Sequence, residues 1–173
     1  VTNADFTPEN RLYATEGKAL LLYSAIIENL SIQSRPEGGA LPTLLDTWIE
    51  QVMTETAGEL GIEANETRLP QHARKVREKL ETKLHKLTIM GSYEFPHVLL
   101  KYYDGYVEEN EDLQRNALRW LKGEYNTKTH ARNDLGVREI IDDSNYYDML
   151  KNFCRLFVSM GYSGFMINLD EAI

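Results

Sequence analysis

The sequence predicts a mainly α-helical fold of five to six helices, with at most a short two-stranded parallel remnant of an α/β sheet. Apolar residues recur every three or four positions through most of the chain, which is the period of an amphipathic helix. Only two stretches resemble strands, residues 1–6 and 165–169. The chain has 173 residues, of which 42% are hydrophobic and 27% charged. This size and composition predict a single domain over residues 1–173 with a buried core.

The first helix is expected directly after the opening strand. Thr7 can cap it, and Pro8 suits its first turn because that turn leaves backbone N–H groups unpaired. A loop over residues 34–39, rich in glycine and proline, separates this helix from the next. The apolar residues of the first helix are Leu12, Ala19, Leu20, Tyr23, Ile26, Ile27 and Leu30, with helical spacing from residue 19.

Two longer helices follow. The second is expected to begin near Pro42 and to stop between Gly58 and Gly61. Pro70 then opens the third helix, and Gly91 ends it. One face of the second helix carries Leu41, Leu44, Leu45, Trp48, Val52 and Met53, and one face of the third carries Ala73, Val76, Leu80, Leu84 and Leu87.

The second half of the chain predicts shorter elements. Ser92 can cap a fourth helix, and a fifth helix is expected over residues 112–122. Residues 125–133 are polar and are interpreted as a loop. A last helix, capped by Asp143 or Ser144, leads into the final strand.

The final strand ends in two adjacent carboxylates. Two glycines bound the apolar run 165–169, which Asp170 and Glu171 follow directly. Ligands bind at the carboxyl edge of open parallel sheets. In P-loop ATPases, an acid at such a strand end holds Mg²⁺ and the next one polarises the attacking water. The pattern equally fits a plain strand end with two solvated acids, so the residues alone leave both interpretations open.

The segment from Arg68 to Lys86 stands out by its charge. It carries seven Lys or Arg residues and two acids, whereas the whole chain has a net charge of −8. This segment could contact nucleic acid or an acidic partner. The interpretation that we favour is a solvated helix face that lies against the acidic residues between Asp104 and Asp112, because no nucleic-acid motif accompanies the charge.

Several kinds of site are not indicated by the sequence. Gly17 and Lys18 form the chain's Gly-Lys pair, but a phosphate-binding loop needs Gly five residues earlier and Ser or Thr afterwards, where Leu12 and Ala19 stand. The single cysteine, Cys154, excludes an intramolecular disulfide, and the four histidines are scattered. No transmembrane span or signal peptide is visible, so a cytoplasmic location is expected.

Four stretches together carry a resemblance. They are Asp5–Thr15, Gly38–Pro42, Ala131–Val137, and Gly161–Gly164 with the later pair Asp170 and Glu171. They resemble the P-loop ATP-binding proteins of bacterial BREX-type phage-defence clusters, and the resemblance spans nearly the whole chain. It implies a fragment of a larger P-loop ATPase, which runs from after the Walker A loop to Walker B.

The resemblance also implies a fold and a chemistry. Residues 1–5 and 165–169 would be parallel neighbours in a sheet, joined by a helical insert. Asp170 would be the Mg²⁺-binding acid and Glu171 the catalytic one, with ATP and Mg²⁺ as cofactors of the full-length parent and inactivity of the fragment alone. The implied partners are the rest of the parent and other defence-system subunits. The alternative is a helical protein-interaction module without a catalytic role.

Overall fold

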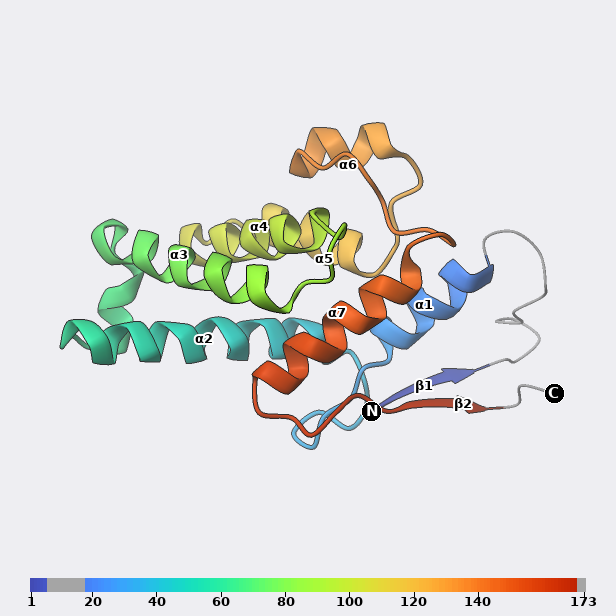
Figure 1. The fold of residues 1–173 in the computed structure, drawn as a ribbon, viewed down its shortest axis with the longest axis horizontal. Helices are drawn as coiled ribbons and strands as arrows, with labels where there is room; N and C mark the ends of the chain where they lie inside the picture. Colours follow the sequence, from blue (N-terminus) through green and yellow to red (C-terminus); the bar gives the residue numbers. More distant parts are fainter. Residues whose placement is uncertain (6–17, 171–173) are drawn as a thin grey trace.

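The computed structural model describes residues 1–5 and 18–170, and in this part of the chain it is mainly helical (Figure 1). Two short strands lie beside each other, close to helices α1 and α7, and the other helices extend away from them. The elements are β1 (Thr2–Asp5), α1 (Lys18–Glu28), α2 (Leu41–Leu60), a 3₁₀ turn (Ala64–Arg68), α3 (Pro70–Leu87), α4 (Glu94–Glu108), α5 (Glu111–Leu121), α6 (Lys128–Leu135), α7 (Tyr146–Ser159) and β2 (Ile167–Asp170).

The two strands form a parallel pair, as expected. Thr2 is in register with Ile167, and Asp5 with Asp170. Parallel strands need a long crossover connection, and here all seven described helices lie between them in the sequence. The fold-class prediction is therefore confirmed, with one helix more than the upper number expected.

Most helix boundaries agree with the sequence signals. α2 begins with proline in its first turn and is capped at its end by Gly61, which has a left-handed backbone (φ 67°) and whose N–H donates to the Ala57 carbonyl. α3 begins at Pro70. The predicted start of the first helix, at Thr7 and Pro8, lies outside the described residues.

Three local predictions are wrong. Residues 125–133 are not simply a loop, since α6 begins at Lys128. Thr127 caps this helix by accepting a hydrogen bond from the His130 N–H at 3.2 Å. The prediction failed because α6 buries only Ala131 and Leu135, which is too little apolar periodicity to recognise. The caps were also misplaced: α4 and α7 are preceded by Tyr93 and Asn145 rather than by Ser92, Asp143 or Ser144.

The core runs through the helices and has large aromatic side chains at its centre. Trp120, Tyr23, Phe95 and Phe153 are all fully buried. Phe95 of α4 and Phe153 of α7 pack edge to face, with ring centroids 5.2 Å apart. This contact joins the helical part that lies far from the strands to the helix that leads into β2.

Candidate functional site

The candidate site is the carboxyl edge of the strand pair. Asp170 is the last residue of β2, and its register partner Asp5 is the last residue of β1. The carboxyl ends of both strands therefore lie next to each other. Nothing is described of the Asp170 side chain, and Glu171 lies outside the described residues. The roles of these two acids therefore stay predictions, while the backbone position of Asp170 is the one that the sequence predicts.

Thr2 fastens the strand pair to helix α1. Its side chain is fully buried, and its hydroxyl donates to the carbonyl oxygen of Ile26 in the last turn of α1. Its backbone N–H donates to the Met166 carbonyl at 3.0 Å, just before β2 begins. A carbonyl in the last turn of a helix has no partner within the helix. Thr2 therefore satisfies such a carbonyl and ties α1 to both strands at once.

The chain start makes a second connection, to Ser31 in the loop that follows α1. The N–H of Ser31 and its hydroxyl both donate to the Val1 carbonyl, at 2.7 and 2.9 Å. The Val1 amino group donates to the Ser31 carbonyl at 3.1 Å. These contacts fix the start of β1 relative to the loop that follows α1. Neither they nor the Thr2 contact has a sequence signature, because each joins residues more than twenty positions apart.

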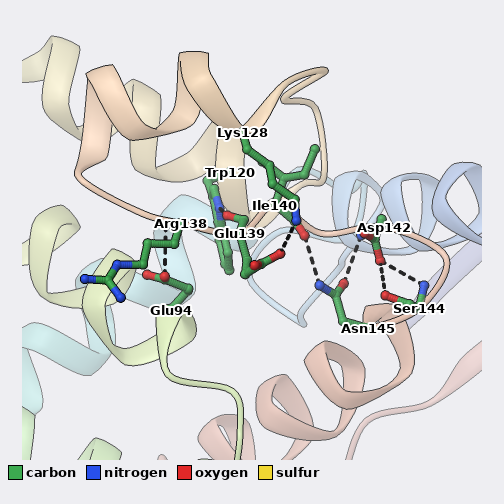
Figure 2. A network of polar contacts seen from close by, with 9 residues as sticks. All are labelled: Glu94, Trp120, Lys128, Arg138, Glu139, Ile140, Asp142, Ser144 and Asn145. Atoms are coloured by element: carbon green, nitrogen blue, oxygen red, sulfur yellow. Dashed lines mark hydrogen bonds and ion pairs between the residues drawn. The ribbon is translucent and has the colours of Figure 1, made fainter.

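The segment that connects α6 to α7, residues 136–145, makes polar contacts with several helices (Figure 2). Near its start, the Arg138 N–H donates to a Glu94 carboxylate oxygen at 2.9 Å. The indole N–H of Trp120 donates to the Glu139 carbonyl at 2.9 Å. The Glu139 carboxylate in turn pairs with Lys128 of α6 at 2.6 Å. The segment is thus bound to α4, α5 and α6.

The other end of this segment reaches α1. Ser144 donates to the Asp142 carboxylate through its N–H at 2.8 Å and through its hydroxyl at 2.6 Å (Figure 2). Burial alone would raise the pKa of the Asp142 carboxyl, but the Ser144 bonds, the Asn145 N–H and the charge of Lys128 together outweigh it and the pKa is lowered. The neighbouring carboxylate of Asp143 accepts the Leu20 N–H of α1 at 2.9 Å. A carboxylate suits the first turn of a helix, where N–H groups are unpaired.

The strand pair leaves apolar side chains exposed. Met166 and Leu169 are 61% and 52% exposed, and Ile167 and Val1 are also exposed. Parallel sheets in proteins are usually covered on both faces, because their connections place helices there. The exposure of these apolar residues departs from that rule.

The basic segment is largely paired with carboxylates. Arg77 makes a two-pronged bond to Asp104, at 2.8 and 3.2 Å, which raises the pKa of the guanidinium. Part of the favoured interpretation is thereby confirmed, because Asp104 belongs to the expected acidic run. The other partners were not expected: Lys79 and Lys83 pair with Glu55 of α2, at 3.4 and 3.1 Å.

Within residues 1–5 and 18–170, no three His, Cys, Asp or Glu residues lie close enough together to hold a metal ion. None of the described helices has both the length and the apolar composition needed to cross a membrane.

Comparison with known proteins gave one match. The family model described as BREX system ATP-binding protein BrxC/D matches residues 1–173, the whole chain. The comparisons with curated proteins and with solved structures gave no match. The match agrees with the sequence motifs and covers the strand pair and every described helix, and on this ground the chain belongs to the family of BREX system ATP-binding proteins BrxC/D.

Proposed function

We propose that this chain is the part of a P-loop ATPase that supplies Walker B-like acids, with a helical insert between two strands of the nucleotide-binding sheet. The observation that carries the proposal is the position of Asp170 at the carboxyl end of β2, beside the carboxyl end of β1. Ligands of open parallel sheets bind at this edge. The family match supports a nucleotide as that ligand.

The two acids are proposed to act differently. A hard cation such as Mg²⁺ binds through carboxylate oxygens and water, so the donor type of Asp170 fits. When bound, Mg²⁺ supplies charge neutralisation at the phosphates. Glu171 is proposed to orient a water molecule and to accept its proton. The hydroxyl of Thr2 and the carboxylate of Asp143 would hold α1 in a fixed position relative to the strand pair.

The exposed apolar residues of β2 support the proposal that further elements of the parent protein cover the strand pair. Residues 1–173 contain no Gly-x-x-x-x-Gly-Lys-Ser/Thr sequence. We therefore propose that the phosphate loop lies elsewhere in a cytoplasmic parent ATPase and that this chain alone does not hold ATP. Isothermal titration of the chain with Mg-ATP tests this directly. A dissociation constant below about 100 μM would contradict it, since such affinity needs an organised phosphate site.

The roles of the acids are tested in the full-length parent. Asp170→Asn removes the charge that binds the cation, so we expect both Mg-ATP affinity and hydrolysis to weaken. Glu171→Gln keeps the shape but loses the basicity. We expect near-normal ATP binding and a turnover rate lowered roughly 10²-fold or more, the scale for loss of a general base. If the Glu171→Gln protein hydrolyses ATP at the parental rate, the alternative of a helical protein-interaction module is favoured instead.

A further inference from the structure

A groove runs along the junction of α2 and α3, away from the strand pair. It consists of two adjoining hollows of about 400 and 310 Å³. Both hollows are lined by Glu55, Lys83 and Lys86, so they are parts of one continuous surface. The first hollow extends to Ser159 at the end of α7, and the second extends along α3 to Lys75.

The two ends of the groove differ in chemistry. The first hollow has an apolar floor, made by Trp48 and Val52 of α2 and by Leu87 at the end of α3. Trp48 is only 3% exposed, so its indole is held by the core and forms a rigid part of this floor. The second hollow is lined by charged residues and Thr82 and has no apolar side chain. A ligand that fills the groove therefore needs an apolar group at one end and charge along the other.

The charge that the groove offers is positive and sits at fixed places. Four lysines stand three or four positions apart on α3 and so share one face of the helix. Lys79 already pairs with Glu59 and Glu55 of α2, and Lys83 pairs with Glu55 at 3.1 Å. Lys75 and Lys86 have no carboxylate within ion-pair distance among the described residues. The stripe is Lys75, Lys79, Lys83 and Lys86.

We propose that this groove binds an acidic peptide segment of a partner protein, in an extended conformation. One carboxylate of the segment would pair with Lys75 and another with Lys86, and an apolar side chain would pack on Trp48 and Leu87. The two lysines are eleven positions apart on α3, which corresponds to about 16 Å of helix rise. Side chains of an extended peptide alternate between its two faces, so two acids that both face the groove must stand an even number of positions apart. Four positions cover about 13 Å, and the flexible lysine side chains reach over the rest.

The groove suits a peptide better than a nucleic acid. The carboxylates of Glu55 and Glu78 line it together with the lysines. The phosphates of a nucleic acid are evenly spaced, and some of them would meet these carboxylates. A peptide can place its acids only at the two unpaired lysines and neutral residues between them. The apolar floor also matches a leucine or phenylalanine side chain better than a phosphate backbone.

Fluorescence anisotropy with a labelled peptide tests the proposal. The probe is an octapeptide that carries two glutamates four positions apart and a phenylalanine two positions after the second one, so that all three side chains face the same side. The paired variant Lys75→Glu/Lys86→Glu removes no ion pair among the described residues, and circular dichroism checks that it folds as the unchanged chain does. We expect saturable binding to the 173-residue chain and at least tenfold weaker binding to the variant. The matched control is Arg132→Glu, a charge reversal on the exposed side of α6, which should bind as the unchanged chain does.

Two altered probes decide whether both ends of the groove act as proposed. Replacing the glutamates of the probe by glutamine, or its phenylalanine by serine, should each weaken binding at least tenfold. Equal binding of either altered probe, or no binding up to about 1 mM, overturns the proposal. Salt-sensitive binding of duplex DNA that the lysine variant abolishes, without peptide binding, overturns it in favour of nucleic acid. The assay contains no nucleotide, so its outcome is independent of the proposed ATPase function.

Discussion

Two glycines in helices of this protein should respond to alanine in opposite directions. Gly105 lies in α4, where α5 folds back against it. A Cβ atom at Gly105 would lie 2.8 Å from the Gln114 Cγ atom, 3.0 Å from the Asn110 carbonyl oxygen and 3.1 Å from the Gln114 backbone nitrogen. Gly58 lies in α2, and a Cβ atom there would meet nothing within 4 Å. The two positions therefore separate helix propensity from packing.

The magnitudes follow from these distances. Alanine in place of glycine stabilises a helix interior by about 0.5–1 kcal/mol. At Gly58 this gain should appear undiminished. At Gly105 the clash includes two backbone atoms that cannot rotate away, because the Asn110 carbonyl accepts the Gln114 N–H at 3.1 Å where α5 begins. Overpacking of this kind costs about 1–3 kcal/mol. Gly105→Ala should therefore be destabilising by about 1–2 kcal/mol, and Gly58→Ala stabilising.

Urea unfolding, followed by circular dichroism, measures both free energies of unfolding on the same chain. For a chain of this size, each kcal/mol also shifts the melting temperature by about 2–4 °C. Gly58→Ala controls for the intrinsic effect of the substitution. If Gly105→Ala is as stable as Gly58→Ala, α5 does not approach α4 as closely as described, and the reasoning is refuted.

Three further predictions concern polar groups. Thr2→Val keeps the shape but removes the hydroxyl bond to α1, so unfolding should become easier by about 1–3 kcal/mol, whereas Thr2→Ser should keep most of the stability in the same urea assay. Removing the Arg77 pair through Asp104→Asn should cost about 0.5–1 kcal/mol at low salt and less at high salt, since the pair is partly exposed; a cost that salt does not change would contradict this. Burial raises the pKa of Asp46 above its ordinary 3.8, so the ionised carboxylate destabilises the folded chain at neutral pH. This destabilisation should disappear as the pH falls through the raised pKa towards 3.8, where the carboxyl is protonated in the folded chain. Asp46→Asn should accordingly be more stable than the unchanged chain at pH 7, with a difference that shrinks towards pH 4 in pH-dependent unfolding, and an unchanged difference would refute the assignment.

Local sequence signals determined most of the secondary structure. α2, α3, α4, α5 and α7 follow from apolar residues at helical spacing, and proline and glycine mark several of their ends. Such signals work because a helix is defined by contacts within a few positions. α6 was not predicted because it buries only two apolar residues. These two residues and the Thr127 cap are too short a pattern to distinguish from a polar loop.

The candidate site likewise has features that the sequence predicted and features that only the structure shows. The sequence alone identified Asp170 and Glu171 as adjacent acids after a strand, and the resemblance to a family predicted that the two strands are parallel neighbours. Only the tertiary structure decided the register that places Asp5 beside Asp170, the Thr2 bond that holds it, and the groove beside Trp48. These features join residues that are far apart in the chain, and no periodicity within one segment encodes which distant segment it will meet.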